Sequence, residues 1–182
     1  MPFPDPPFFD LGDDIFIDLG ETIILSAQTD FTPASYFWAP DSYLNCTDCE
    51  MPLAVPANDI TYLLTITDEN GCTFTDEVNV FVQKARNVYA PSAFSPNNDA
   101  LNDEFTLFTG QQVSKINNLL IFDRWGALMF EQYNFEPNNL SIGWDGQHKG
   151  QMMNPGVYVW FAEVEFLDGQ VELYEGEVIL IR

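Results

Sequence analysis

The chain has 182 residues, of which 28 are Asp or Glu and only 6 are Lys or Arg, so its formal net charge is −22. This charge argues against nucleic acid as a partner, because the phosphate backbone requires a basic surface, and against anionic lipid, which attracts clusters of Lys and Arg. Hydrophobic residues make up 46% of the chain and aromatic residues 15%, which is too apolar for a disordered protein. No apolar run reaches the roughly 18 residues of a membrane span, so we expect no direct membrane insertion.

The first nine residues stand apart in composition. They include Pro2, Pro4, Pro6 and Pro7, and Pro-rich segments favour extended, semi-rigid linkers. They contain neither the basic region nor the apolar core of a signal peptide. We therefore expect residues 1–9 to be a linker and the chain to be a piece of a longer protein.

Residues 10–83 contain a series of short runs rich in β-branched side chains. Ile60–Thr67 has largely Thr at one set of alternate positions and apolar residues at the other, as a half-buried strand does. Asn70-Gly71 follows and supplies the positive φ that a tight hairpin needs. Several short strands at this spacing are typical of a β-sandwich. The predicted strands are Asp14–Leu19, Thr22–Ala27, Tyr36–Trp38, Ile60–Thr67 and Val78–Val82.

Residues 88–182 repeat this pattern. Asp168-Gly169 predicts a hairpin, and Gly126 offers a second turn. Pro155-Gly156 precedes the longest predicted strand, where a proline removes no ladder hydrogen bond. The sequence therefore predicts an all-β fold of two consecutive immunoglobulin-like antiparallel β-sandwiches. The predicted strands are Glu104–Phe108, Leu119–Asp123, Leu128–Glu131, Val157–Phe166, Val171–Tyr174 and Val178–Ile181.

The charge is distributed unevenly along the chain. Residues 1–83 contain 15 acids and no Lys or Arg, whereas residues 84–182 contain 13 acids and all six bases. Lys84 and Arg86 are the first two bases, and such a shift in composition indicates a domain boundary. We predict one domain over residues 10–83, a linker over 84–87 and a second domain over 88–182.

Two of the three cysteines, Cys46 and Cys49, have the spacing of a redox motif or of half a zinc site. The redox motif needs a βαβ context that the pattern lacks, and a zinc site needs further ligands, whereas the only histidine is His148. We expect Cys46 and Cys49 to form a loop disulfide. Cys72 is an alternative partner for either of them.

The chain carries no recognisable catalytic motif. His148 is the only base available for a Ser-His-Asp or Cys-His triad, and its surroundings, residues 145–150, form a polar turn. No glycine-rich phosphate loop is present, and with 28 acids no single carboxylate pair stands out. We predict a protein that is not an enzyme and has no catalytic residue.

The segment Ser95–Asp103 concentrates side-chain oxygens. Ca²⁺ prefers six to eight oxygen ligands from closely spaced carboxylates, amides and carbonyls. The alternative is a network of Asx turns, in which these side chains accept hydrogen bonds from their own backbone. The calcium hypothesis names Asn97, Asp99, Asn102 and Asp103 as ligands and Ca²⁺ as the only candidate cofactor.

A set of motifs in the second half carries a family resemblance. Residues 88–182 resemble the type B C-terminal sorting domain of the type IX secretion system of Bacteroidetes, also called the gliding-motility-associated C-terminal domain. One departure is that Asn98 and Ala100 stand where the family loop usually has glycines. The motifs, in order, are Ala90–Asn97, Leu101–Phe105, Ile121–Gly126, Phe130–Glu131, Trp144–Gly146, Pro155–Tyr158 and Gly176–Arg182.

The first half resembles a PKD-like immunoglobulin repeat. The resemblance rests on Tyr36–Pro40, Cys46–Cys49, Tyr62–Asp68 and Asn70–Cys72. Repeats of this kind are usually spacers or adhesive modules, so the resemblance implies a spacer domain.

Together the resemblances imply a non-catalytic secretion signal for a larger cargo protein. The cargo would reach the periplasm first and then cross the outer membrane through the type IX translocon, to the cell surface or the medium. The implied partners are the translocon and outer-membrane shuttle or attachment proteins.

Candidate recognition residues are Arg124, Trp125 and the terminal strand, because aromatic residues and Arg dominate binding hot spots. For Trp144, a second candidate anchor, packing in the core is favoured. The apolar terminal run suits a strand buried on both faces, or buried on one face and recognised at the other. We expect this strand to complete the sandwich and its exposed edge or end to be read by the secretion machinery. Its candidate residues are Gly176, Val178, Leu180, Ile181 and Arg182, whose guanidinium suits bidentate contacts with carboxylates.

The alternative function is an adhesive or carbohydrate-binding β-sandwich of a surface protein, with a surface glycan as its partner. It is motivated by the aromatic residues of the first half, which are Phe3, Phe8, Phe9, Tyr36, Phe37, Trp38 and Tyr43.

Overall fold

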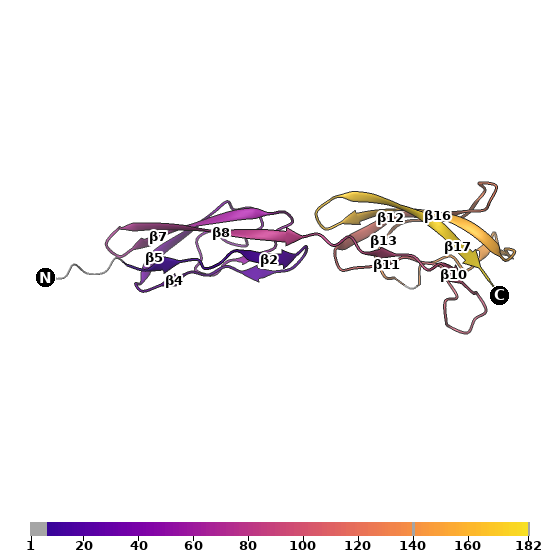
Figure 1. Ribbon diagram of the computed structural model, residues 1–182, viewed down its shortest axis with the longest axis horizontal. Helices are drawn as coiled ribbons and strands as arrows, with labels where there is room; N and C mark the ends of the chain where they lie inside the picture. The colour runs from indigo at the N-terminus through magenta and orange to yellow at the C-terminus, as the bar shows by residue number, and fades with distance from the viewer. Residues whose placement is uncertain (1–6, 140, 182) are drawn as a thin grey trace. The chain divides into compact units, whose positions relative to one another are not determined.

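The computed structural model describes residues 7–139 and 141–181. The chain divides into two compact units, Met1–Lys84 and Ala85–Arg182 (Figure 1). Within the described residues the regular elements are strands and there is no helix, which confirms the predicted all-β fold. None of the described segments is a helix long and apolar enough to cross a membrane. Residues 1–6 of the predicted linker and Arg182 lie outside the described residues.

The first unit is built on a four-stranded sheet with the order β2-β8-β7-β5. Asn70 and Gly71 form the turn between the two central strands, where Gly71 has a φ of 83°. These two strands pair antiparallel, as expected, but β2 joins the sheet parallel to β8, which the predicted antiparallel sandwich did not include. The strands of this sheet are β2 (Ile15–Asp18), β5 (Pro33–Ala39), β7 (Ile60–Asp68) and β8 (Thr73–Gln83). Two short ladders accompany it: β1 (Phe9–Asp10) with β4 (Gln28–Thr29), and β3 (Ile23–Ile24) with β6 (Leu53–Ala54).

Alternation along the central strands forms the core of the first unit. Tyr62, Leu64 and Ile66 on β7 are fully buried, whereas the residues between them face outward. The Tyr62 hydroxyl donates a hydrogen bond to the Ser42 carbonyl, 2.9 Å away, and burial raises the pKa of Tyr62 to about 12. The buried indole of Trp38 donates to the Cys49 carbonyl at 3.0 Å, so both aromatic residues bring their polar atoms to a partner.

The second unit is built on a five-stranded sheet with the order β10-β17-β16-β12-β13. Its long strands pair antiparallel, and only the short β10 runs parallel to its neighbour. The strands are β10 (Ala93–Phe94), β12 (Val113–Phe122), β13 (Leu128–Phe135), β16 (Gly156–Phe166) and β17 (Val171–Leu180). Two short ladders accompany it: β9 (Val88–Tyr89) with β11 (Phe108–Thr109), and β14 (Gln147–His148) with β15 (Gln151–Met152).

Two predicted elements of the second unit differ from the structure. The predicted strands Val171–Tyr174 and Val178–Ile181 are parts of one strand, β17, because pairing with β16 continues through the polar interruption between them. The predicted strand Glu104–Phe108 is reduced to a single bridge between Phe105 and Trp144, followed by β11.

Trp144 lies in the core of the second unit. Its side chain is fully buried, and its indole nitrogen donates a hydrogen bond to the Gln147 carbonyl at 2.8 Å. Its ring lies 5.3 Å from the ring of Phe94 and 4.7 Å from that of Tyr158, measured between centroids. Trp144 is therefore a packing residue and not an exposed anchor.

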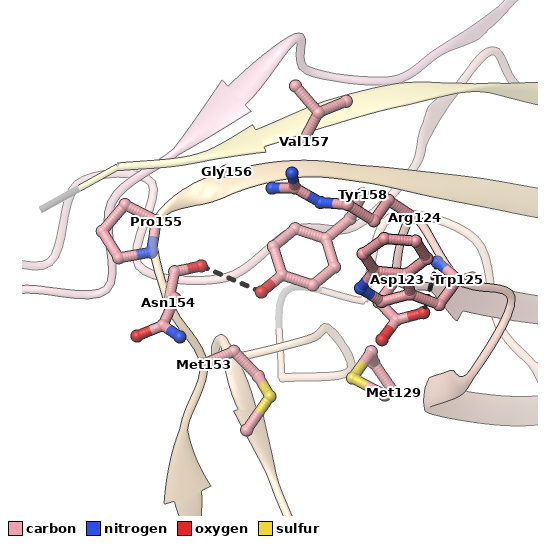
Figure 2. A pocket seen from close by; sticks show the side chains of 10 residues that line it. All are labelled: Asp123, Arg124, Trp125, Met129, Met153, Asn154, Pro155, Gly156, Val157 and Tyr158. Carbon is pink, nitrogen blue, oxygen red and sulfur yellow. Dashed lines mark hydrogen bonds between the residues drawn. The ribbon is translucent and has the colours of Figure 1, made fainter.

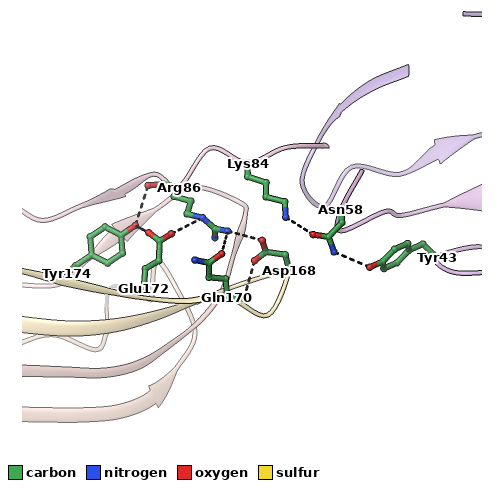
Figure 3. Close-up of polar contacts among 8 residues, drawn as sticks. All are labelled: Tyr43, Asn58, Lys84, Arg86, Asp168, Gln170, Glu172 and Tyr174. Carbon is green, nitrogen blue, oxygen red and sulfur yellow. Dashed lines mark hydrogen bonds and ion pairs between the residues drawn. The ribbon is translucent and has the colours of Figure 1, made fainter. Parts of the chain in front are cut away.

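Within the second unit, Arg86 is held by the β16–β17 hairpin (Figure 3). Its guanidinium lies 2.8 Å from the carboxylate of Asp168 and 2.9 Å from that of Glu172, and stacks 4.4 Å above the ring of Phe166. Burial, reinforced by the hydrogen bond to Glu172, raises the pKa of Tyr174 to about 12. The side chain of a predicted linker residue is thus fixed to the second unit.

Within the first unit, Lys84 donates from Nζ to the Asn58 side-chain oxygen at 2.7 Å. Asn58 in turn donates to the Tyr43 hydroxyl at 3.3 Å (Figure 3). The two bases that mark the change in composition are therefore each bound by their own unit.

Candidate functional site

The β12–β13 turn presents Trp125 to solvent. The Asp123 carboxylate accepts hydrogen bonds from the backbone N–H groups of Trp125, at 2.8 Å, and Ala127, at 2.9 Å. Gly126 has a φ of 81°, a conformation that glycine adopts without steric cost. The Asp123 carboxylate thus holds the backbone of the turn, while the Trp125 side chain remains 85% exposed. Trp is enriched among the residues that dominate binding energies at protein interfaces, so the exposed Trp125 is a candidate contact residue.

A pocket of about 280 Å³ lies beside this turn (Figure 2). The Tyr158 hydroxyl donates to the Asn154 carbonyl at 2.9 Å on one side of it. Arg124 is exposed, and its guanidinium passes over Gly156, where a β-carbon would lie 3.4 Å from Nη2. The lining thus combines a cation, aromatic rings and two thioethers. The lining residues are Asp123, Arg124, Trp125, Met129, Met153, Asn154, Pro155, Gly156, Val157 and Tyr158.

The sheet brings this turn to the end of the terminal strand. Phe122, the last residue of β12, pairs with Val159 on β16. Gly156, the first residue of β16, pairs with Leu180, the last residue of β17. Arg124, Trp125 and the end of β17 therefore meet at one end of the sheet, although more than 50 residues separate them in the sequence.

The terminal strand alternates between core and solvent. Val178 and Leu180 are fully buried, whereas Ile179 and Ile181 are 44% and 47% exposed. A partner cannot contact the buried pair directly, so among these four residues only Ile179 and Ile181 remain available for recognition. Arg182 belongs to the same candidate set and lies outside the described residues.

The edge of β17 near its end is covered. Ile179 N–H donates to the Ser92 carbonyl at 2.9 Å, and Ile181 N–H donates to the Phe94 carbonyl at 3.0 Å. The short strand β10 thus occupies the edge that we expected to be exposed at these residues. A partner that adds a strand there would have to displace β10.

Gly176 has a packing role. It lies opposite Trp160 in the β16–β17 ladder, and a β-carbon on Gly176 would lie 3.0 Å from the indole ring. The absence of a side chain therefore makes room for a buried tryptophan. This contact accounts for the glycine without any role in recognition.

The Asn/Asp loop satisfies its own backbone. Asp103 accepts hydrogen bonds from the N–H groups of Asn97 and Asn98 through Oδ1, at 2.9 and 2.7 Å, and from Ala100 through Oδ2, at 2.8 Å. Asp99 accepts from Leu101 N–H at 2.8 Å. These contacts form a network of Asx turns. Calcium binding here stays a prediction, and within the described residues no group of three His, Cys, Asp or Glu side chains is arranged to hold a metal ion.

Three residues of this loop have left-handed backbones. The φ angles are 62° at Asn98, 67° at Ala100 and 53° at Asn102. Asn tolerates this conformation, but alanine is strained in it. The family that residues 88–182 resemble usually has glycines at the positions of Asn98 and Ala100, and glycine adopts this left-handed conformation without strain.

Glu104 lies in an acidic environment next to this loop. Desolvation, followed by repulsion from Asp145 and Asp103, raises the pKa of Glu104. The carboxylate is close to the backbone of Gly143, where a β-carbon would lie 3.0 Å from Oε2. The folded state therefore holds the Glu104 proton more tightly than an unfolded chain does.

Cys46 and Cys49 form a disulfide in the first unit, with their Cα atoms 6.0 Å apart. The loop that they close supports Trp38, because Thr47 accepts from the Trp38 backbone N–H at 2.8 Å. Cys72, the alternative partner, is exposed and not part of a disulfide. Its backbone N–H donates to Asp68, and this contact is the main cause of a lowered pKa for the Asp68 carboxyl.

Sequence reasoning did not assign Met129, Met153 and Tyr158 to the candidate site. They line the pocket beside Trp125 but come from β13, a loop and β16. The resemblance motif Pro155–Tyr158 contained a usable signal, because it includes the first residues of β16, which pair with the end of β17.

Comparison with known families decides the identity of the second unit. The family model described as the CHU_C type IX secretion signal domain matches residues 88–180, which are 93 of the 182 residues. The chain belongs to this family. A type IX secretion signal domain is a non-catalytic sorting signal, which confirms the resemblance and the prediction that the protein is not an enzyme. Membership implies interaction with the type IX secretion machinery and export to the cell surface or the medium.

Solved structures similar to the chain include three of low sequence identity. The PKD domain from KIAA 1837 protein is 21% identical, with a TM-score of 0.39, over 46% of this chain and 93% of that one. Dimeric latent PorU from Porphyromonas gingivalis is 16% identical, with a TM-score of 0.35, over 97% of this chain and 20% of that one. The D00-D0 domain of intimin is 12% identical, with a TM-score of 0.37, over 97% of this chain and all of that one. No curated protein matches the chain.

Proposed function

We propose that residues 88–182 direct a larger cargo protein through the type IX translocon, from the periplasm across the outer membrane. The observation that carries this proposal is the match of the secretion signal family to residues 88–180. The partners are the translocon and outer-membrane shuttle or attachment proteins. In this assignment residues 10–83 form a PKD-like spacer domain and residues 84–87 a linker.

The surface read by these partners includes Arg124, Trp125 and Ile181. Support comes from the 85% exposure of Trp125 beside a pocket, and from the pairing of β12, β16 and β17 that brings the turn to the end of the terminal strand. Arg and Trp together supply a planar cation and a large apolar ring, the combination most common in binding hot spots. Val178 and Leu180 act indirectly, by packing the terminal strand against the core, and Gly176 does so by leaving room for Trp160.

The test is secretion of a reporter that carries its own signal peptide and is fused in front of residues 1–182, in a bacterium with a type IX system. Trp125→Ala and Arg124→Ala should lower the secreted fraction about tenfold each. Tyr133→Ala, which removes a half-exposed aromatic on the neighbouring strand β13, is the matched control. The assignment of this turn to the recognised surface fails if Trp125→Ala and Arg124→Ala are both secreted like the wild type, while urea unfolding shows that both variants are folded.

The adhesive alternative is favoured by one observation on the first unit. Phe16 and Phe81 stack with centroids 5.0 Å apart on its outward sheet face, and Phe37 on β5 is also exposed. Exposed aromatic rings on a sheet are suited to stacking on sugar rings. A glycan array probed with the full chain and with Phe37→Ala separates the functions, because a spacer predicts no binding in either case.

A further inference from the structure

The outward face of the five-stranded sheet is apolar at its centre. Leu120 on β12 pairs with Phe161 on β16, and Phe122 pairs with Val159 in the next row. These residues alternate with the buried core residues of their strands, so they lie on the opposite face. The outer patch is defined as Leu120, Phe122, Val157, Val159, Phe161 and Ile179.

This composition is unusual for a solvated face. An antiparallel sheet with one face in water normally has polar residues at the outward positions. In the first unit much of the outward face of the central strands follows this rule, since Thr65 pairs with Thr75 and Thr67 with Thr73. The exceptions there are the exposed Leu63 and Phe81. In the second unit the equivalent central positions are Leu, Phe and Val. An apolar patch of this kind marks an interaction site.

The patch is hollowed and bordered by glutamates. Leu120, Phe122, Val159, Phe161 and Glu175, with Trp160, line a shallow pocket of about 380 Å³. In one row Leu120 and Phe161 lie between Glu131 on β13 and Glu175 on β17, and in the next row Val159 is followed by Glu177. The first row thus has an acidic residue on both sides of its apolar centre, and the second row has one on the β17 side, with Leu128 opposite Phe122 on the β13 side.

We propose that the outer patch binds a protein of the export route whose own contact surface is apolar at the centre and bordered by Lys and Arg. The acidic border selects this charge, because complementary potentials favour association and like charges oppose it. A second copy of the chain is a poor occupant, since the same glutamates would face each other. Anionic lipid is disfavoured for the same reason. The inference rests on the proposed export function and adds to it a second contact surface and the chemistry of the partner.

The experiment uses a reporter fused to the full chain in a type IX-competent bacterium. The double variant Val159→Thr, Phe161→Thr makes the centre polar and places a β-branched residue, which favours a strand, at both positions. Its matched control is Val171→Thr, Leu173→Thr, which makes the same kind of change at exposed positions of β17 outside the patch. Glu175→Lys, Glu177→Lys reverses the border, and Asp48→Lys, Glu69→Lys is its control in the first unit with the same change of net charge.

We expect secretion of the threonine and lysine patch variants to fall about tenfold or more, and secretion of both controls to stay within about twofold of the wild type. Urea unfolding of the purified proteins separates lost binding from lost folding. If the threonine variant unfolds, the lysine variant tests the proposal instead, because Glu175 and Glu177 are exposed and their substitution should leave the fold intact. Normal secretion of the patch variants, with normal secretion of the wild type, would overturn this inference alone. Failure of the wild type to be secreted would overturn the export function and this inference with it.

Discussion

Gly176 and Trp160 face each other across the β16–β17 ladder, and the indole of Trp160 fills the space where a side chain of residue 176 would stand. In a strand, glycine is normally less stable than alanine because it loses more backbone entropy on folding. At this position the packing reverses that order. We expect Gly176→Ala to destabilise the chain by about 1–3 kcal/mol, because an added methyl group overpacks a buried ring.

Urea unfolding measures this effect. Glu175→Ala, at the neighbouring exposed position, should change the free energy of unfolding by no more than about 0.5 kcal/mol. Equal stability of Gly176→Ala and the wild type would show that the indole can move aside.

Arg86 is expected to be a main source of stability at the start of the second unit. Its partner Asp168 has a side chain only 4% exposed, and removing one member of a buried, hydrogen-bonded ion pair is strongly destabilising. Arg86→Ala should cost about 2–3 kcal/mol, and Arg86→Lys should not restore it, because lysine lacks the planar fork that reaches both carboxylates.

The control for this pair is Lys115→Ala. It removes a more exposed ion pair with Glu165, 3.2 Å in length, and should cost about 0–1 kcal/mol. A loss for Arg86→Ala as small as that of the control would contradict the importance of the Arg86 contacts.

Ala100 is strained in its left-handed conformation. Ala100→Gly should raise the free energy of unfolding by about 1 kcal/mol, because the relief of the β-carbon clash exceeds the added entropy of the unfolded chain. The same substitution at Ala93, in strand β10, should instead lower stability by about 0.5–1 kcal/mol. Thermal or urea unfolding of both variants gives opposite signs if the argument is correct.

Asp103 tests the two accounts of the Asn/Asp loop. Asp103→Ala leaves three backbone N–H groups without their acceptor, so the midpoint of thermal unfolding, Tm, should fall. The hydrogen-bond network predicts the same fall in millimolar Ca²⁺ and in chelator. A calcium site predicts a higher Tm in Ca²⁺ for the wild type only, because a ligand that binds the native state stabilises it by mass action.

Glu104 should make stability depend on pH. Its pKa is raised in the folded state above the ordinary value of 4.5, so the unfolded chain binds fewer protons between the two values. Stability therefore falls as the pH rises through this window. Glu104→Gln should raise Tm at pH 7, and the gain should vanish at about pH 3, where both states of the wild type are protonated. Glu136→Gln controls for the change of net charge; an equal gain there would refute the local explanation.

Local chemistry made the turns predictable. Asn70-Gly71, Gly126 and Asp168-Gly169 all lie in turns between paired strands, and all three glycines have positive φ angles. Each of these turns requires a positive φ, which few residue types adopt, so one or two residues of the sequence are enough to predict the turn. The strands on either side of these turns are predictable from the alternation of apolar and polar residues, but several predicted strands are shorter than the observed ones.

Pairing between distant segments was beyond sequence reasoning. The first part of β12, Val113–Asn118, is too polar to indicate a strand, yet it is held by β16 on one side and from Ile116 onward also by β13. The parallel pairing of β10 with β17 joins segments more than 80 residues apart. Nothing local in Ala93-Phe94 indicates that it covers the edge of the terminal strand.

The candidate site was predictable in its residues but not in their exposure. Trp125 and Trp144 are the same residue type in similar polar turns, and only the tertiary fold makes one exposed and the other buried. The run Val178–Ile181 is continuously apolar, so the sequence did not reveal which side chains face outward. The register with β16 decides this.

The central claim is that residues 88–182 act as a type IX secretion signal. The most direct measurement is the secreted fraction of a reporter that carries its own signal peptide and is fused in front of residues 1–182, compared between a bacterium with an intact type IX translocon and an otherwise identical strain without it. We predict that the reporter reaches the cell surface or the medium only in the first strain, and that a reporter carrying residues 1–87 alone stays in the periplasm in both. Equal secretion in the two strains, or secretion of the reporter that lacks residues 88–182, would contradict the account.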